Sequence, residues 1–314
     1  MSNILISGST GFVGGNLSGY LTTLGHTIYH LSRTVNDSEN QIAWSNVNEV
    51  RNLQLDAYIH LAGKAHDLQN TSEPEEYFTV NTGLTIKLFD EFLNSQATTF
   101  IYFSSVKAAA DTVTNVLDEE AEPNPKTPYG QSKLRAEQYL LAQTLPSNKK
   151  LYILRPCMIH GPGNKGNLNL LYKFVSKGIP YPLAAFVNRR SFLFIDNLKF
   201  IINRLITDSS IPSGIYNIAD DDSLSTVEVV KIISGTLNRK PKLLYLSQGL
   251  LIAISKIGDK LSLPINSERL KKLTENYVVS NQKLKAAMHV ESLPVSTQDG
   301  LIETIKSFNY KSQI

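Results

Sequence analysis

Short apolar runs alternate with longer amphipathic stretches through the first half of the chain. Five runs have the length and composition of buried strands: residues 4–7, 27–31, 57–62, 100–104 and 151–154. Three of the intervals have helical periodicity: Phe12–Leu24, Glu75–Leu93 and Tyr129–Gln143. This alternation predicts an α/β fold with a doubly wound parallel sheet and helices on both faces. Ligands of such sheets bind beyond the carboxyl ends of the strands.

The alternation stops after Gly161-Pro162-Gly163, and the rest of the chain is less regular. Two apolar runs, Phe192–Ile195 and Ile215–Ile218, are expected to rejoin the sheet, and helical patterns cover Thr226–Leu237 and Thr297–Phe308. We therefore expect a larger sheet domain and a smaller mixed domain that caps it. The larger one comprises residues 1–163 and about 190–219; the smaller comprises 164–189 and 220–314.

A glycine-rich turn, Gly8-Ser9-Thr10-Gly11-Phe12-Val13-Gly14, directly follows the first predicted strand. Glycines permit a tight turn and let the backbone approach a pyrophosphate at the following helix N-terminus. Because a strand precedes the turn and a helix follows it, we interpret it as a dinucleotide site rather than a plain strand–helix connection. The expected cofactor contacts in the turn are Gly8, Thr10, Gly11, Phe12, Val13 and Gly14.

Arg33 ends the second predicted strand, where NAD-binding chains carry an acid for the ribose 2′-hydroxyl. No acid occurs there before Asp37. A guanidinium binds phosphate oxygens in a bidentate manner, so Arg33 favours NADP(H), whose 2′-phosphate it suits, and NAD(H) stays the alternative. An Arg33 that stacks on the adenine or points to solvent would carry no such preference.

Tyr129 and Lys133 lie four residues apart behind Pro128, which suits the first turn of a helix. Positions i and i+4 share a helix face, so the phenol and the ammonium point into the same space. A neighbouring cation lowers a phenol pKa, and a drop of about three units requires about 4 kcal/mol. Tyr129 would then shuttle protons. Since this spacing arises by chance about once in such a chain, an ordinary amphipathic helix is the alternative.

Composition limits the kinds of binding partner and the cellular location that this chain is expected to have. A net charge of +3 without a basic run predicts no nucleic-acid partner, and the apolar run Leu250–Ile254 is too short for membrane insertion. The N-terminus lacks the features of a signal peptide, and the single Cys157 fits a reducing, cytoplasmic location. His60 and His66 lack metal-ligand spacing, so no metal is expected.

Three features together resemble the extended short-chain dehydrogenase/reductase family of nucleotide-sugar epimerases, dehydratases and ketoreductases. They are the glycine turn, Ser104-Ser105 at a strand end, and the Tyr129/Lys133 pair. Further segments agree: His60-Leu61-Ala62-Gly63, Val80-Asn81-Thr82-Gly83 and Leu154-Arg155-Pro156 through Gly161-Pro162-Gly163. The resemblance covers nearly the whole chain. It implies a Rossmann-like fold, a C-terminal substrate-binding domain and a homodimer formed by the helices at 75–93 and 129–143.

By that resemblance, catalysis is assigned to Ser105, Tyr129 and Lys133. Ser105 would bind the reacting sugar oxygen and Tyr129 would exchange its proton, while Lys133 would lower the tyrosine pKa and hold the nicotinamide ribose. Further cofactor contacts are implied at Leu61, Ala62, Gly63, Asn81, Ser104, Tyr129, Lys133 and Pro156. Substrate contacts are implied at Ser105, Asn167, Arg190 and Arg269. The arginines would grip a diphosphate, and surface salt bridges are their alternative role.

Val106 and Lys107 stand where the dehydratases of this family carry Asp-Glu. A valine cannot transfer a proton, so 4,6-dehydration is disfavoured, and C4 epimerisation or C4 keto reduction is expected instead. The segments 104–107, 188–198 and 269–283 resemble reductases of UDP-4-keto-6-deoxy-N-acetylhexosamines, and that reduction is the favoured function. The alternatives are a UDP-glucose or UDP-N-acetylglucosamine 4-epimerase and a non-catalytic NADP(H)-binding regulator. Ala108-Ala109-Ala110 replaces the family's V-Y-G or V-N-G, so no side chain of this triplet reaches the sugar.

Overall fold

The computed structural model describes residues 1–35, 40–64, 73–164, 166–261 and 266–310, with the backbone alone at 258, 260, 261, 268, 269, 272, 309 and 310. Seven strands form a central sheet in which every neighbouring pair is parallel. In spatial order they are β10 (Gly214–Ile218), β7 (Lys150–Pro156), β5 (Thr99–Phe103), β4 (Ala57–His60), β1 (Asn3–Ser7), β2 (Thr27–Ser32) and β3 (Gln41–Ala43). The predicted α/β fold with a doubly wound sheet is confirmed.

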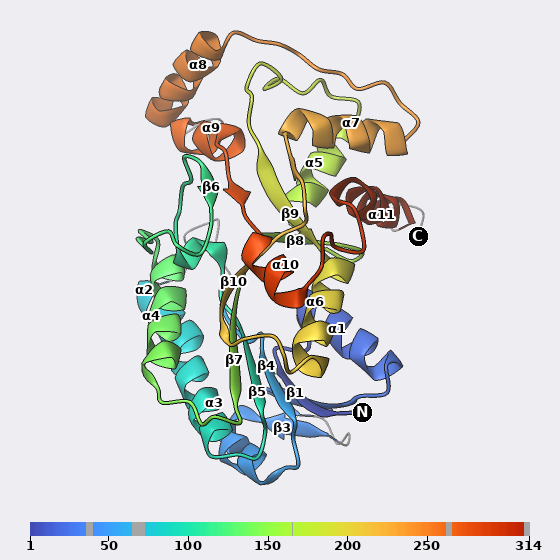
Figure 1. The fold of residues 1–314 in the computed structure, drawn as a ribbon. Coiled ribbons are helices and arrows are strands. Elements are labelled where there is room, and N and C mark those ends of the chain that lie inside the picture. Colours follow the sequence, from blue (N-terminus) through green and yellow to red (C-terminus); the bar gives the residue numbers. More distant parts are fainter. Residues whose placement is uncertain (36–39, 65–72, 165, 262–265, 311–314) are drawn as a thin grey trace.

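Helices cover both faces of this sheet (Figure 1). One face carries α1 (Phe12–Thr23), α6 (Ile195–Thr207) and α10 (Gln282–Met288); the other carries the 3-10 helix η1 (Trp44–Asn52), α3 (Leu84–Leu93) and α4 (Pro128–Ala142). Ile4 and Ile6 of β1 pack towards the first group and Leu5 packs towards the second. Because both faces are buried, strands of this sheet have continuous apolar sequences.

The helix predicted at Glu75–Leu93 contains a change of pitch. The segment starts as α2 (Pro74–Tyr77), widens into the π-helical turn η2 (Phe78–Gly83) and continues as α3. Such π turns are frequent at functional sites. This one carries Asn81, whose side chain is fully buried.

One strand prediction is wrong. Ile215–Ile218 joins the central sheet as β10, but Phe192–Ile195 does not, because β9 (Arg190–Phe194) belongs to a separate three-stranded sheet. Its neighbours there are β8 (Met158–His160) and β11 (Ser223–Leu224). The chain leaves the central sheet at Cys157, whose N–H donates to Ile218 at 3.1 Å, and β8 then offers its own edge to β9. An apolar run does not specify which sheet it enters.

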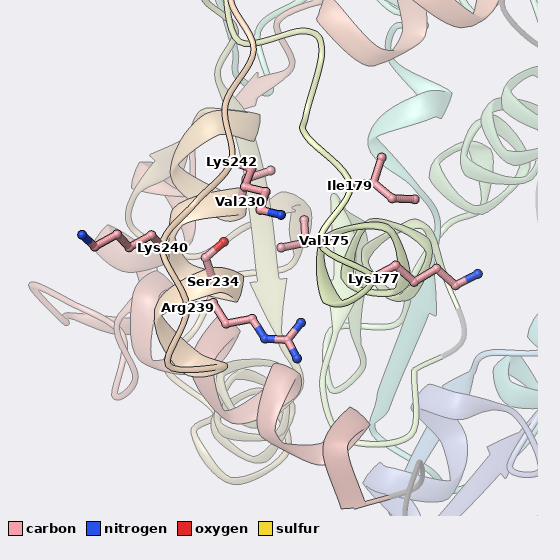
Figure 2. A pocket seen from close by; sticks show the side chains of 9 residues that line it. Val175, Lys177, Ile179, Val230, Ser234, Arg239, Lys240 and Lys242 are labelled. Carbon is pink, nitrogen blue, oxygen red and sulfur yellow. The ribbon is translucent and has the colours of Figure 1, made fainter.

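The remaining helices form a smaller lobe at the far end of the molecule (Figure 1). They are α5 (Asn167–Ser176), α7 (Thr226–Thr236), α8 (Gln248–Leu261), α9 (Ser267–Thr274) and α11 (Thr297–Tyr310). A cavity of about 530 Å³ lies beside α5 and α7, lined by Val175, Lys177, Gly178, Ile179, Val230, Ser234, Arg239, Lys240 and Lys242 (Figure 2). None of the predicted site residues lines this cavity.

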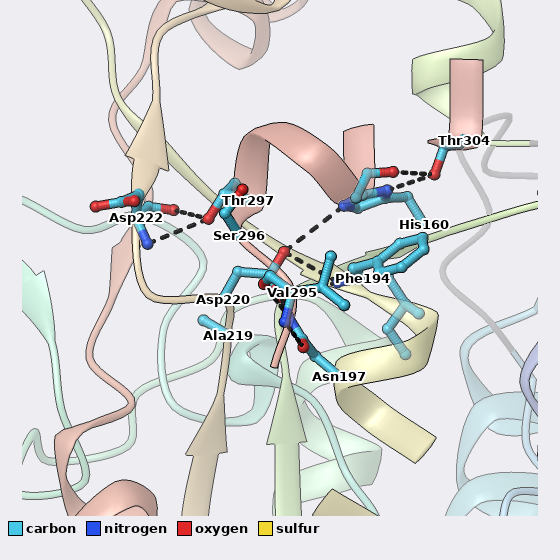
Figure 3. Close-up of polar contacts among 12 residues, drawn as sticks. His160, Phe194, Asn197, Ala219, Asp220, Asp222, Val295, Ser296, Thr297 and Thr304 are labelled. Carbon is cyan, nitrogen blue, oxygen red and sulfur yellow. Dashed lines mark hydrogen bonds and ion pairs between the residues drawn. The ribbon is translucent and has the colours of Figure 1, made fainter. Parts of the chain in front are cut away.

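A buried polar network ties this lobe to the sheet domain (Figure 3). The Asp220 carboxylate, just beyond β10, accepts hydrogen bonds from Phe194 N–H and from Asn197 Nδ2. His160 lies 3.8 Å from the same carboxylate and shares a 2.9 Å hydrogen bond with Thr304 of α11. A buried carboxylate needs such partners, and here they come from segments that are far apart in the sequence.

Candidate active site

The glycine turn lies where the strand order of the sheet reverses. β1 has β2 on one side and β4 on the other, so the crevice between the turns after β1 and β4 is the expected ligand site of an open α/β sheet. Gly8 has a positive φ of 74°, and a Cβ built there would lie 2.7 Å from the backbone nitrogen of Ala62. The two turns are therefore in contact through Gly8.

The backbone of this crevice forms a cradle that stays open because glycines, which have no side chain, occupy positions of its turn. A Cβ on Gly14 would lie 2.3 Å from the Gly8 carbonyl oxygen, so glycine alone lets α1 begin this close to the turn. Gly11 is the N-cap of α1 and no side chain caps this helix start, so the N–H groups of its first turn have no partner within the helix. This arrangement fits the pyrophosphate of a dinucleotide.

Arg33 is the residue directly after β2, and its side chain is exposed. Across the crevice, Leu61, Ala62 and Gly63 continue from β4, and the Ala62 N–H donates to Ser7 Oγ at 3.2 Å. Pro156 ends β7, which lies two strands beyond β4 in the sheet.

The three predicted catalytic side chains converge at the end of β5. Ser105 follows that strand and its hydroxyl is hydrogen-bonded with Tyr129 of α4. Tyr129 is half-buried, and Tyr77 packs against its ring edge-on at 6.2 Å. Lys133, one turn later, is buried and donates to the Phe103 carbonyl at 2.8 Å. The sequence spacing therefore brings these groups together as predicted.

Lys133 is not among the groups that shift the pKa of Tyr129, so the lowering of that pKa by Lys133 stays a prediction. Burial raises the pKa of the Tyr129 phenol above its ordinary value, and the hydrogen bond with Ser105 lowers it in part. Burial also lowers the pKa of Lys133, and the nearby Glu137 carboxylate raises it in part, so that the pKa is about 8. Tyr129 is thus a phenol that keeps its proton at neutral pH.

A buried ion pair behind Lys133 was missed by the sequence reasoning. Glu137, one turn beyond Lys133 on the same face of α4, accepts from Arg155 Nε at 3.0 Å and from Arg155 Nη2 at 2.6 Å. Both side chains are about 1% exposed. The hydroxyl of Ser104, a predicted cofactor contact, donates to the same carboxylate. The signal was present, since Glu137 continues the i, i+4 series of Tyr129 and Lys133.

Asn81 connects the π turn to both sides of the crevice. Its side-chain oxygen accepts from Lys64 N–H at 2.7 Å, and its Nδ2 donates to Ser132 Oγ at 3.0 Å. Ser132 lies between the two predicted catalytic residues of α4. Asn81 is also close to Gly63, where a Cβ would lie 2.9 Å from the asparagine oxygen and 3.2 Å from Lys133 Nζ. This predicted cofactor contact therefore also positions the catalytic helix.

His60 is a packing residue. Its ring is fully buried between the hydroxyls of Ser7 (2.6 Å) and Thr85 (3.0 Å). Burial and the nearby Lys133 ammonium lower the pKa of His60 to about 3. His66 lies outside the described residues. In the part of the chain that is described, no group of three or more His, Cys, Asp or Glu side chains is arranged to hold a metal.

The predicted substrate contacts are less closely grouped. Arg190, at the start of β9, is half-buried and pairs with Glu275 at 3.7 Å. Asn167 is exposed at the first turn of α5. Arg269 lies in α9, and its side chain is outside the described part of the chain.

A distant tyrosine covers the alanine triplet beside Ser105. The Tyr277 hydroxyl donates to the Ala110 carbonyl at 2.6 Å, and its ring lies 4.2 Å from Lys107 Nζ. Tyr277 also pairs its backbone with Arg190. An aromatic side chain thus reaches this side of the site from another segment, and no local sequence signal could have placed it there.

Reduction of a ketone, or its reverse, needs a dinucleotide beside a group that can exchange a proton, and this crevice brings a dinucleotide cradle and a phenol together. The fold and the site define an extended short-chain dehydrogenase/reductase. The model of the NAD dependent epimerase/dehydratase family matches residues 4–219, and the chain belongs to that family.

Individual relatives act on activated sugars. The chain is 31% identical over 279 residues to UDP-glucose 4-epimerase of Vibrio cholerae, covering 83% of this chain and 85% of that protein. It is 25% identical to N-acetyl-alpha-D-glucosaminyl-diphospho-ditrans,octacis-undecaprenol 4-epimerase of Escherichia coli O157:H7, covering 97% and 94%. The crystal structure of UDP-N-acetylglucosamine 4-epimerase from Bacillus cereus superimposes with a TM-score of 0.77 over the whole of both chains at 20% identity, which shows the shared fold. The chain is therefore an enzyme of the nucleotide-sugar epimerase and reductase kind.

Proposed function

We propose that this enzyme transfers hydride at C4 of a UDP-linked hexose, in the direction that reduces a 4-keto group. The observation that carries the proposal is the position of the Tyr129 phenol, hydrogen-bonded to Ser105 just beyond β5 and one turn before Lys133, whose ammonium lies beside Gly63. A neutral phenol is a proton donor, and reduction of a ketone needs one at the new alkoxide. The Vibrio cholerae relative supports a UDP-linked hexose as substrate.

In this proposal each residue at the site has a separate role. Ser105 orients the sugar oxygen and Tyr129 donates its proton to it, while Lys133 would lie beside the nicotinamide ribose. When bound, the cofactor supplies the hydride. Gly8, Gly11 and Gly14 would hold its pyrophosphate, and Leu61, Ala62, Gly63 and Asn81 would line its far side. Val106 cannot remove a proton, which favours simple C4 chemistry over dehydration.

Arg33 supports NADP(H) as the exchanged cofactor. It is exposed one residue beyond β2, where a guanidinium can meet a 2′-phosphate, and no acid precedes Asp37 in the sequence. A reductase consumes one reduced cofactor in each turnover and so needs a cofactor that exchanges. NAD(H), which the family description specifies, is the alternative.

A 4-epimerase is the second candidate, and the relatives favour it. The Vibrio cholerae and Escherichia coli relatives are both named as 4-epimerases. An epimerase oxidises and re-reduces the same carbon, so it retains its cofactor and needs none added. Arg190 and Arg269 would bind the sugar's diphosphate in either case.

Two assays separate these functions. Loss of NADPH absorbance with a UDP-4-keto-6-deoxy-N-acetylhexosamine shows reduction; interconversion of UDP-glucose and UDP-galactose, or of their N-acetyl forms, without added cofactor shows epimerisation. Tyr129→Phe should lower turnover by about 10²–10⁴-fold and leave cofactor affinity unchanged. Tyr139→Phe on the same helix, where the hydroxyl bonds to Asp90, is the matched control. Cofactor binding without turnover of any nucleotide sugar would indicate the regulator instead.

Assembly and domain roles are proposed from the same resemblance. We infer a cytoplasmic homodimer in which the helical segments Glu75–Leu93 and Tyr129–Gln143 pack against their copies. Residues 1–163 and about 190–219 would bind the cofactor, and residues 164–189 and 220–314 would bind the nucleotide sugar. Light scattering of the purified enzyme gives its molar mass in solution and so tests the homodimer. None of the helices in the described ranges has the length and apolar character to cross a membrane.

A further inference from the structure

Exposed apolar side chains concentrate on one part of the smaller lobe. Most of the large hydrophobic residues that are exposed in the described chain lie in two segments, 179–187 and 244–257. They are Ile179, Val187, Leu244, Tyr245, Leu250, Ile252, Ile254 and Ile257. Scattered single residues of this kind are ordinary, whereas a group of them marks an interaction surface.

The two segments lie side by side. Tyr181 N–H donates to the Lys242 carbonyl at 2.8 Å, and Leu244 N–H donates back to the Tyr181 carbonyl at 2.9 Å. Gln248, the first residue of α8, donates from its side chain to the Ala185 carbonyl at 2.8 Å. Residues 179–187 and 242–257 thus form one continuous surface, which we call the α8 face.

α8 has more apolar residues than the fold buries. Leu251 and Ser255, four residues apart, face inward and are buried. Leu250, Ile254 and Ile257 form a second apolar stripe at spacings i, i+4 and i+7, and they are 50%, 38% and 54% exposed. α8, a helix of fourteen residues, therefore has one buried side and a separate apolar stripe that stays exposed in the described chain.

The charge near this stripe is mostly positive. No Asp or Glu occurs in residues 229–258, and Asp259, near the end of α8, is hydrogen-bonded to Ser267. Lys177, Arg239, Lys240 and Lys242 line the neighbouring cavity (Figure 2), and Lys256 is exposed on α8. A second copy of this surface would bring cations against cations, whereas anionic lipid headgroups complement them.

We propose that the α8 face docks on the surface of an anionic lipid bilayer. The stripe of Leu250, Ile254 and Ile257 enters the boundary between headgroups and acyl chains, and the lysines meet the lipid phosphates. Fourteen residues are too few to span the hydrocarbon core, so α8 lies in the plane of the interface.

Docking would place the substrate side of the active site close to the bilayer. α9 packs against α8, and the chain then reaches Glu275, which pairs with Arg190, and Tyr277, which contacts the alanine triplet beside Ser105. The proposal rests on the α8 face alone, and it holds whichever sugar the site takes.

Sedimentation with lipid vesicles tests the docking. The full-length protein should pellet with vesicles of phosphatidylcholine and phosphatidylglycerol, bind vesicles of phosphatidylcholine alone much more weakly, and lose affinity as salt is added. The double variant Leu250→Ser/Ile257→Ser removes two stripe residues and should lower the partition coefficient by at least about tenfold. Lys240→Glu/Lys242→Glu should lower it on anionic vesicles alone.

Leu24→Ser is the matched control, since Leu24 is exposed to a similar degree at the end of α1 in the other domain. Its partition coefficient should equal that of the unmodified protein, and thermal unfolding should show that all variants are folded. Failure of the unmodified protein to pellet with anionic vesicles would overturn the proposal. So would undiminished binding by the stripe variant, or an oligomer in solution that this variant dissociates, which would assign the face to a second copy.

Discussion

Removing the Arg155 guanidinium should destabilise the whole protein, because it leaves the buried Glu137 carboxylate without its paired charge and with the Ser104 hydroxyl as its remaining hydrogen-bond donor among those described above. Glu137 and Arg155 are each about 1% exposed and share two hydrogen bonds, at 3.0 and 2.6 Å. Breaking a buried pair from one side costs about 3–5 kcal/mol. The variant Arg155→Leu should lose that amount from the free energy of unfolding.

The corresponding thermal shift follows from chain length. An unfolding entropy of about 2.1 cal/mol/K per residue amounts to about 0.66 kcal/mol/K for 314 residues. The loss in Arg155→Leu is therefore a fall of about 5–8 °C in the melting temperature. Calorimetry and urea titration followed by circular dichroism measure the two quantities independently.

A partly exposed pair provides the control. Arg51 and Glu91 lie 2.7 Å apart, and their side chains are 42% and 13% exposed. Pairs near the surface contribute about 0–1 kcal/mol, so Arg51→Leu should change the melting temperature by less than about 2 °C. The double variant Glu137→Met/Arg155→Leu removes both buried charges and should be more stable than Arg155→Leu by at least about 1 kcal/mol. Equal effects of Arg155→Leu and Arg51→Leu would refute the assignment, as would a double variant whose loss is the sum of its parts.

Three further predictions follow from the site. Gly14→Ala places a Cβ 2.3 Å from the Gly8 carbonyl and should weaken NADPH binding at least about tenfold, whereas Gly15→Ala, with 3.7 Å to its nearest atom, should not; calorimetric titration compares them. Arg33→Asp should lower affinity for NADPH about tenfold or more and spare NADH, and equal losses for both would contradict the 2′-phosphate assignment. Because the pKa of His60 is about 3 when folded and about 6.5 when unfolded, the unfolded chain binds the extra proton between these values. Stability should therefore fall as pH drops from about 6.5 towards 3, by up to about 1.4 kcal/mol per unit, and His60→Gln should remove this slope in urea titrations at stepped pH.

Much of the sheet domain could be predicted from local patterns. The strands predicted near Ile4, Ala57 and Leu151 and the helix that starts at Phe12 occur within about two residues of their predicted bounds, because burial on both faces leaves continuous apolar runs. The run that forms β9 is equally apolar, yet it pairs with β8 outside the central sheet. The apolar character of a strand does not specify which strand it pairs with.

What the sequence determined by itself is the cradle and the catalytic face. A glycine turn between strand and helix, and a tyrosine and a lysine one turn apart, are local features that need no knowledge of the rest of the fold. Tertiary structure alone decided where the Lys133 ammonium bonds, that Arg155 would neutralise Glu137, that Tyr277 would reach Ala110, and that one stripe of α8 would stay uncovered. Each of these depends on burial and on contacts between segments distant along the chain, and such contacts leave no period or spacing in a single sequence.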